Sequence, residues 1–181
     1  MIETRQTIAI AAPIEGVWEY VAHIPNWAGF MPGLQDFSIT DADTSRWALK
    51  VGVGGMLRQV KVQVHVDQWA GPQLATFSYQ LEGDPVLGGG SYAAARNSGG
   101  GTDITLTVRV EGSGPMAPMW EAMGRPLLPG FVKAFAEQLQ KQIEGGAADS
   151  DPPKAARAKA SLIASLWRWL QSCLRRAFQR P

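Results

Sequence analysis

Residues 60–67 read Val60-Lys61-Val62-Gln63-Val64-His65-Val66-Asp67, and residues 104–111 read Ile104-Thr105-Leu106-Thr107-Val108-Arg109-Val110-Glu111. In both stretches an aliphatic side chain alternates with a polar one. Because successive side chains of a strand point to opposite faces, this spacing predicts two strands, each with one buried and one solvated face. Sheets of that kind are usually antiparallel. The two stretches therefore predict an antiparallel sheet with a single apolar face.

Shorter segments around these two show the same period. One of them contains Trp47 and Leu49 at alternate positions, and another contains Phe77 and Tyr79. The glycine-rich stretch at residues 97–101 is typical of a hairpin turn. The complete pattern predicts seven strands, at residues 4–11, 34–41, 46–53, 57–69, 73–82, 89–97 and 102–113.

Helices are predicted on both sides of the strand-rich region. Pro13 is expected at the first position of a short helix that runs to Val21, and prolines 25 and 32 bound a second short turn. Residues 116–143 have helical spacing, and prolines 126 and 129 with Gly130 are expected to break or kink that helix near its middle. Its apolar stripe is predicted to face the sheet, which gives an α+β fold with a seven-stranded antiparallel sheet around a long C-terminal helix.

Charge divides the chain into two parts. Residues 1–151 carry 10 basic and 16 acidic side chains, for a net charge of −6, whereas residues 152–181 carry 7 basic side chains and no acidic one. Residues 145–153 are small or polar without an apolar period. We therefore predict a ligand-binding domain at residues 1–144, a flexible linker at 145–160 and an amphipathic helix at 161–181.

The predicted C-terminal helix has one apolar half and one polar half. Charged side chains interrupt its apolar sequence, so the helix cannot span a bilayer. The sequence therefore indicates a helix that lies on a membrane surface. A groove of a partner protein and the chain's own domain are the alternative docking sites. The residues expected to contact the membrane are Leu162, Ile163, Leu166, Trp167, Arg168, Trp169, Leu170, Leu174, Arg175, Arg176 and Phe178.

The first residues lack the pattern of a secretory signal, and the lone Cys173 cannot form an internal disulfide. A cytoplasmic protein, peripheral on the inner face of the cell membrane, is therefore expected. The acidic domain and the tryptophans of the tail argue against a nucleic-acid partner.

Three motifs carry a resemblance to a known family: residues 10–18 (IAAPIEGVW), residues 31–33 (MPG) and residues 50–54 (KVGVG). Over residues 2–143 the chain resembles the START-like (SRPBCC) superfamily, and more closely the family of the G subunit of carbon monoxide dehydrogenase. The resemblance implies a helix-grip fold with a pocket between sheet and long helix. It also implies an accessory protein of a molybdenum hydroxylase that binds a membrane quinone or a similar lipid, with no covalently bound cofactor.

A pocket of this kind would be lined by apolar side chains from the long helix and the strands opposite. Methionine suits such a wall because its thioether adapts to varied shapes. Small residues at 88–90 and 93–95 are expected to leave volume for a ligand, although the same apolar stripe could instead fill a solid core. The predicted lining residues are Trp47, Leu49, Phe77, Tyr79, Tyr92, Met116, Met119, Trp120, Met123, Leu127 and Phe131.

Catalytic and metal-binding patterns are absent from the sequence. The two histidines are His23 and His65, and the second alternates with valines and is expected to face solvent. Five side chains could donate a hydrogen bond to a ligand carbonyl: Arg58, Tyr79, Tyr92, Arg96 and Arg125. Residues of these types lie more often at a surface or at a helix cap.

The sequence therefore predicts a non-catalytic carrier of a quinone-like or other isoprenoid molecule, in which residues 126–130 and 88–90 open the pocket. A START-like cyclase or aromatase and a ligand-free membrane-recruitment adaptor are the two alternatives.

Overall fold

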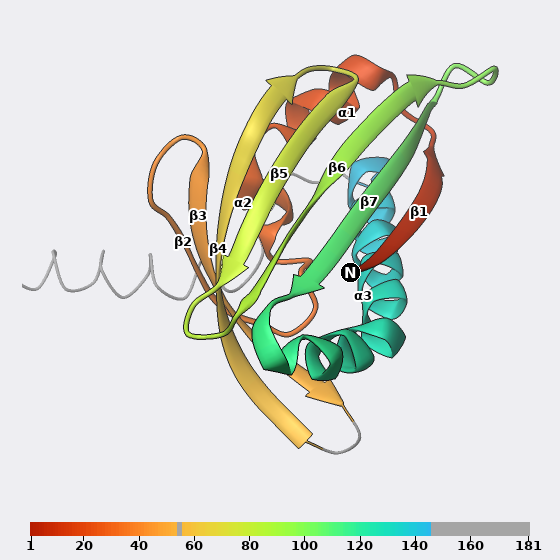
Figure 1. The fold of residues 1–181 in the computed structure, drawn as a ribbon. Coiled ribbons are helices and arrows are strands. Elements are labelled where there is room, and N and C mark those ends of the chain that lie inside the picture. Colours follow the sequence, from red (N-terminus) through yellow and green to blue (C-terminus); the bar gives the residue numbers. More distant parts are fainter. Residues whose placement is uncertain (54–55, 146–181) are drawn as a thin grey trace, which may run out of the picture. The chain divides into compact units, whose positions relative to one another are not determined.

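The computed structural model describes residues 1–53 and 56–145. The chain forms a strand, two short helices, six further strands and a long helix, which is the predicted order (Figure 1). Every predicted strand is present, with ends that differ by at most three residues. The elements are β1 (Ile2–Ile10), α1 (Ile14–Val21), α2 (Ile24–Ala28), β2 (Leu34–Ile39), β3 (Thr44–Val53), β4 (Met56–Ala70), β5 (Leu74–Leu81), β6 (Val86–Arg96), β7 (Thr102–Gly112), the 3-10 turn η1 (Gly114–Met116) and α3 (Ala117–Gly145).

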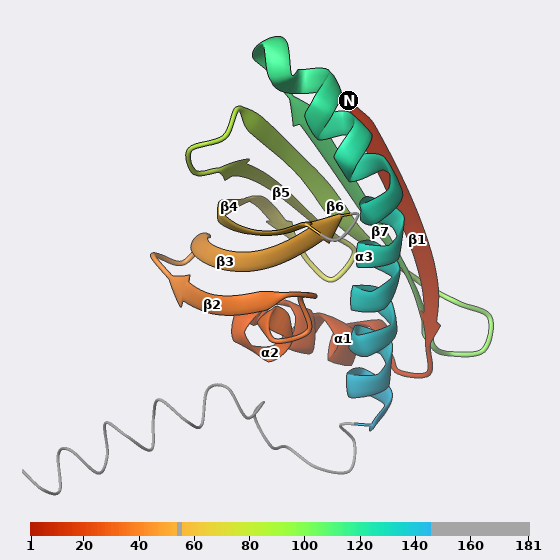
Figure 2. The same cartoon turned by 90° about the horizontal axis from the view of Figure 1, so that it is seen from below.

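The strands form one antiparallel sheet in the order β1-β7-β6-β5-β4-β3-β2. Strands β2 to β7 are joined to their neighbours in chain order, whereas β1 pairs with β7 because α1 and α2 separate it from β2. Figure 2 shows β1 running alongside α3 while β2, β3 and β4 curve away from that helix. This arrangement of a curved sheet around one long helix is the START-like helix-grip fold that the sequence predicts.

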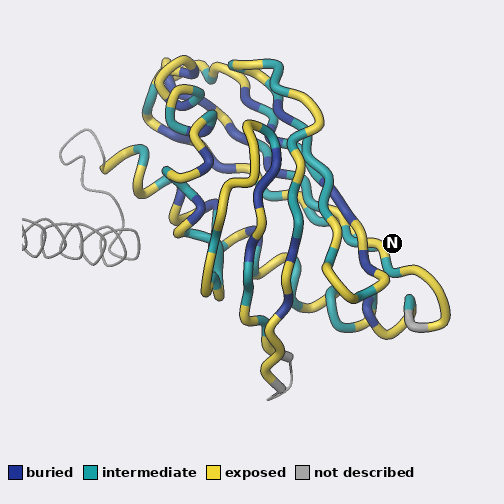
Figure 3. The backbone as a smooth tube through the Cα atoms, turned by 90° about the vertical axis from the view of Figure 1, so that its left-hand side faces the viewer, coloured by how far each residue is buried: buried dark blue, intermediate teal, exposed yellow. Residues whose placement is uncertain are grey.

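Burial alternates along the strands as the period-two pattern requires. In β4, Val60 and Val62 are buried and Lys61 is exposed, and His65 is exposed as predicted. In β7, Ile104 is fully buried. The tube in Figure 3 shows this alternation of buried and exposed positions along the sheet. The apolar face of the sheet therefore faces α3.

Helix α1 begins one residue later than predicted. Pro13 is the N-cap residue rather than the first helical residue, and its carbonyl accepts the amide of Val17 at 3.1 Å. Proline is tolerated on either side of this boundary because the first turn of a helix leaves its amides unpaired. The helix then buries Ile14, Val17 and Val21 against the core.

Prolines 126 and 129 bend α3 but do not break it. Each proline lacks the amide hydrogen that would bond the carbonyl four residues earlier, and its ring crowds that carbonyl. The helix nevertheless continues from Ala117 to Gly145. In Figure 1 its first turns, in green, run in a different direction from the later blue turns. The predicted kink is present, and the alternative of a break is wrong.

Residues 88–90 are not a loop. Gly88 and Gly90 lie within β6 and pair with Tyr79 and Phe77 of β5. A Cβ atom on Gly88 would lie 2.4 Å from Cζ of Tyr79, and one on Gly90 would lie 2.7 Å from Cζ of Phe77. The two rings therefore occupy the volume that the glycines leave. The prediction that this segment forms a gate is wrong, because both of its edges are hydrogen-bonded to neighbouring strands.

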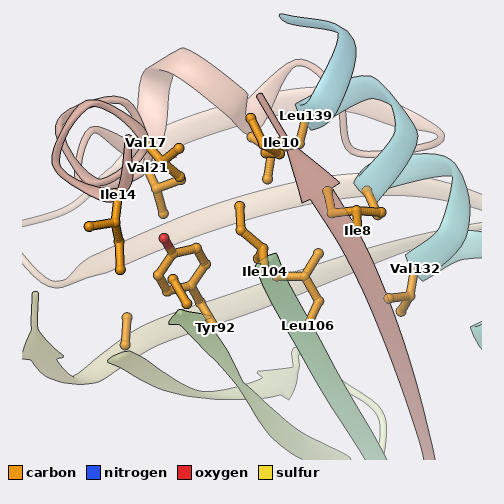
Figure 4. Close-up of a cluster of buried hydrophobic side chains, with 13 residues drawn as sticks. Ile8, Ile10, Ile14, Val17, Val21, Tyr92, Ile104, Leu106, Val132 and Leu139 are labelled. Carbon is orange, nitrogen blue, oxygen red and sulfur yellow. The ribbon is translucent and has the colours of Figure 1, made fainter. Parts of the chain in front are cut away.

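Two buried clusters form the core. One joins β1, α1, β5, β6, β7 and α3, and Figure 4 shows Ile10, Ile104 and Leu139 within it. Ala94 belongs to this cluster, so the volume it leaves is taken by core side chains. The other cluster joins α2, β3 and β4 around Trp47. Both clusters contribute to the wall of one cavity.

Candidate ligand-binding site

A cavity of about 360 Å³ lies between α3 and the apolar face of the sheet. Its wall takes side chains from strands β3 to β7, from α3 and from the α1–α2 region. Pockets for small molecules commonly enclose about 300–1,000 Å³. The cavity is therefore large enough for a small molecule and is not a packing defect.

The wall is almost entirely apolar. Among the described residues that line it there is no Asp, Glu, Lys, Arg, His or Cys. Its serines and threonines are Ser45, Thr76, Ser91 and Thr107, and all but Ser45 belong to outward positions of their strands. A charged group placed here would lose its hydration without gaining a partner. The cavity therefore favours a neutral, apolar occupant.

The structure brings together most of the residues that the sequence assigns to the pocket. The strands contribute one set and the bent helix the other, and they face each other across the cavity. The predicted residues in the wall are Trp47, Leu49, Phe77, Tyr79, Tyr92, Trp120, Met123, Leu127 and Phe131.

Met119 is a correction to the predicted wall. Its residue surface is 41 % exposed, and it does not line the cavity. A Cβ on Gly112 would lie 2.8 Å from Ala117 and 3.2 Å from the Trp120 side chain, so these two residues set the face of α3 that touches the sheet. Met119 is two residues past Ala117 and so lies on the opposite side of the helix. Met116 belongs to η1, and its side chain lies outside the described part of the chain.

Sequence reasoning did not assign the wall contributed by the α1–α2 region. Val21, Ile24, Trp27 and Met31 line the cavity, and the indole of Trp27 lies 5.7 Å from that of Trp47 in a stacked arrangement. Of the three large apolar residues between prolines 25 and 32, Trp27 and Met31 line the cavity, and this pair was the signal in the sequence. A short turn needs no such pair, but the end of a cavity does.

The fold pairs the polar atoms of four aromatic side chains in the wall. The indole nitrogens of Trp27, Trp47 and Trp69 donate to the Val21 carbonyl at 2.8 Å, Ser45 Oγ at 2.8 Å and Asp43 Oδ1 at 2.9 Å. The hydroxyl of Tyr79 crosses β6 above Gly88 and donates to the carbonyl of Arg109 in β7 at 2.8 Å. Pairing of this kind is expected for polar groups removed from water.

Tyr92 differs from the other aromatic residues of the wall. The residue is 5 % exposed, and its hydroxyl has no hydrogen-bond partner. Figure 4 shows this hydroxyl directed toward Val17 and Val21 of α1. The ring packs 6.0 Å from that of Trp18. Burial raises the pKa of Tyr92 to about 12, so the group is a neutral hydroxyl at physiological pH.

The arginines considered as ligand contacts are used elsewhere. Arg58 donates to both carboxylate oxygens of Asp84, at 2.7 and 2.8 Å, and its guanidinium lies 4.9 Å from the centre of the Trp120 ring. Arg96 pairs with Glu15 on the surface, and Arg125 is exposed. None of these arginines lines the cavity.

Tyrosine titration gives a first test of this burial. Burial raises the pKa of all three tyrosines, Tyr20, Tyr79 and Tyr92, above the ordinary value of 10.0. As the pH rises, the unfolded chain therefore releases these protons before the native chain does. The contribution of the three tyrosines to folding stability is complete below pH 10 and is lost as the pH rises toward 12. For Tyr92 the loss is on the order of 2 kcal/mol. We expect spectrophotometric titration to show little tyrosinate at pH 10 in the native protein. Half-ionisation of the tyrosines at that pH would contradict the described burial.

The prediction also concerns a linker, a membrane-surface helix and the absence of a metal site. The linker beyond Gly145 and the amphipathic helix at 161–181 lie outside the described residues. Within the described residues, no helix is long and apolar enough to cross a membrane. In the same part of the chain, His, Cys, Asp and Glu side chains form no group of three that could hold a metal ion.

Comparison with solved structures shows the fold. A conserved protein from Geobacillus kaustophilus is 18 % identical, with a TM-score of 0.67 over 78 % of this chain and 95 % of that one. A START superfamily protein from Mycobacterium smegmatis is 14 % identical, with a TM-score of 0.60 over 79 % and 97 %. The Zhui aromatase/cyclase from Streptomyces sp. R1128 is 17 % identical, with a TM-score of 0.53 over 78 % and 95 %.

Comparison at the level of sequence shows the family. No curated protein matches the chain. Residues 1–144 match the family described as polyketide cyclase / dehydrase and lipid transport, a description that covers both enzymes and carriers. The match spans the whole strand-rich region and all but the last residue of α3. The chain therefore belongs to the polyketide cyclase/dehydrase and lipid transport family.

Proposed function

We propose that this protein is a non-catalytic carrier that encloses a neutral apolar molecule, a quinone or another isoprenoid lipid. The observation that carries the proposal is the cavity of about 360 Å³, whose described wall has no charged side chain. Burial of an apolar ligand there would contribute about 25 cal/mol for each Å² removed from water. Nine aromatic side chains give the wall flat, rigid surfaces that suit a ring system.

The second part of the proposal concerns the membrane. The apolar half of residues 161–178 and the seven basic groups of residues 152–181 support docking on an anionic membrane surface. Docking would bring the cavity close to a pool of lipid ligand on the inner face of the cell membrane. Delivery to a molybdenum hydroxylase completes the proposal, and it is supported by the motifs at residues 10–18, 31–33 and 50–54.

A cyclase or aromatase is the second candidate, favoured by the family description and by the fold shared with an aromatase/cyclase. Such an enzyme needs a group that exchanges protons near neutral pH. Among the described lining residues, the buried hydroxyl without a partner is that of Tyr92, and its pKa of about 12 does not suit it as a base at pH 7. The physical chemistry of the wall thus supports the carrier more than the enzyme.

Native mass spectrometry of the full chain tests the carrier. We expect the protein purified from its own host to carry an apolar molecule in a 1:1 complex, because the empty cavity exposes apolar surface. Organic extraction and chromatography then give the chemical class of the molecule. Recovery of the same lipids from denatured protein would indicate adventitious lipid, and a chemically altered molecule released over time would favour the cyclase.

A further inference from the structure

The cavity is closed in different ways at two ends, which lie roughly 20 Å apart along α3. At one end Trp27 meets Phe135 edge-on at 5.7 Å, and both side chains pack against the core cluster of Figure 4. At the other end Val86 and Trp120 line the cavity and are 5 % and 8 % exposed. Among the described buried apolar residues, these two belong to neither core cluster. Core packing therefore closes the first end but not the second.

An arginine supports the second end from outside. Arg58 occupies a position of β4 in phase with Val60 and Val62, so it belongs to the face of the sheet that faces α3. Its guanidinium lies 4.9 Å from the centre of the Trp120 ring. One terminal nitrogen of the same guanidinium donates to both carboxylate oxygens of Asp84, at 2.7 and 2.8 Å. Arg58 therefore ties β4 to the β5–β6 turn and to the first turns of α3.

Wall residues of the cavity surround this contact. Val51 of β3 is the residue that pairs with Arg58 in the sheet, and Val86 follows Asp84 by two residues. The side chain of Arg58 is 50 % exposed, whereas that of Asp84 is 14 % exposed. The ion pair thus has the apolar cavity on its inner side and solvent on its outer side.

From these contacts we infer that Arg58 and Asp84 hold Trp120 as the end wall of the cavity, and that this wall limits the length of the ligand. Arg58 is a positioning residue, because it acts through Trp120 and does not itself line the cavity. The inference rests on the proposed carrier function. It narrows the cargo to apolar molecules whose length fits between the Trp27 end and the Trp120 end.

The affinity of a chain of increasing length measures where such a cavity ends. Each methylene that is removed from water raises the affinity about fourfold. A methylene that is forced against a filled space costs free energy instead, as overpacking does in a protein core. The cation–π contact and the charge-assisted hydrogen bonds resist displacement of the Trp120 ring. Affinity should therefore rise with chain length and stop rising at the length that reaches Trp120.

A series of 2-methyl-1,4-naphthoquinones with linear alkyl chains of increasing length at carbon 3 tests the inference on the full chain. Dissociation constants come from the quenching of tryptophan fluorescence. We expect the affinity of wild type to rise about fourfold for each methylene up to one turning point. Arg58→Ala should move the turning point to chains about two carbons longer and should bind the first over-length chain about tenfold more tightly than wild type. Asp84→Ala should move it in the same direction.

Arg46→Ala is the matched control. Arg46 forms an ion pair with Glu82 at 3.4 Å, on the face of the sheet opposite to Trp47, and does not line the cavity. Its removal should leave the turning point where wild type has it. Fluorenone, a flat neutral ketone without a chain, is the control ligand: wild type and Arg58→Ala should bind it equally, because it is too short to fill the cavity from end to end.

Trp120→Leu removes the end wall directly and should lengthen the accepted chain even with Arg58 present. Melting temperatures of all variants separate a loss of folding from a change in accepted length. A uniform loss of affinity in Arg58→Ala, with the turning point unmoved, would show that this arginine only stabilises the fold and would overturn the inference. An equal movement of the turning point in Arg46→Ala, or no turning point in wild type, would overturn it as well. Failure of every quinone and of fluorenone to bind wild type would instead contradict the carrier function itself.

Discussion

Replacement of Leu127 by Glu is expected to weaken fluorenone binding at pH 7 by about 100-fold or more, since a charge buried with the ligand costs several kcal/mol. Leu127 lines the cavity from the middle of α3. Leucine and glutamate have similar size and helix propensity, so the helix should form equally well in the variant. The affinity is measured by fluorescence titration and the fold by circular dichroism.

The matched control is Leu127→Gln, which has the same shape as Glu without the charge. It should weaken binding by about tenfold, in proportion to the smaller cost of an unpaired neutral amide. Lowering the pH toward 5 should protonate the buried carboxyl in the Glu variant and bring its affinity close to that of the Gln variant. Equal affinities for wild type and both variants would show that the ligand binds outside the cavity.

Removal of residues 152–181 is expected to abolish sedimentation of the protein with vesicles that contain anionic phosphatidylglycerol. Burial of the apolar half of the tail yields on the order of 10 kcal/mol gross, and each basic group adds about 1 kcal/mol at an anionic surface. After ordering costs, we expect the full chain to partition at least about 100-fold more strongly than the truncated chain. The truncated chain should keep its melting temperature, because the expected linker has no apolar period and so no apolar contact to lose.

Two sets of substitutions separate the two sources of membrane affinity. Changing Trp167 and Trp169 to Ser should weaken vesicle binding at every salt concentration. Changing Arg168, Arg175 and Arg176 to Gln should weaken it mainly at low salt, because only the electrostatic attraction is screened. Equal vesicle binding by the full and truncated chains would refute the membrane proposal, and loss of thermal stability on truncation would point to a tail that packs on the domain.

The fold followed from the sequence because local and global signals agree in it. Period-two alternation in β4 and β7 specified both strand type and buried face, and the turn at Asn97 is built as its sequence indicates. The Asn97 side-chain oxygen accepts the amides of Gly99 and Gly101 at 3.0 Å, and Gly100 has a φ of +82°. Residue type and required conformation thus coincide at this turn.

The site was less predictable because it depends on how elements meet. A helical stripe identified Trp120, Met123 and Leu127 but gave no means of excluding Met119. The side of α3 that touches the sheet is set by the close approach of Ala117 to Gly112 across the connection from β7 to α3, a contact that helical periodicity does not encode. Likewise, no sequence pattern distinguishes Tyr79, whose hydroxyl is satisfied across β6, from Tyr92, whose hydroxyl is not.

The rings that lie over Gly88 and Gly90 have an evolutionary consequence. Each glycine and the aromatic residue opposite it occupy one shared space, so a side chain gained on β6 must be matched by a smaller one on β5. A single substitution at either position creates a clash or a hole. Cavity shape can therefore diverge between relatives through paired exchanges on two adjacent strands, while the helix and the sheet topology are inherited unchanged.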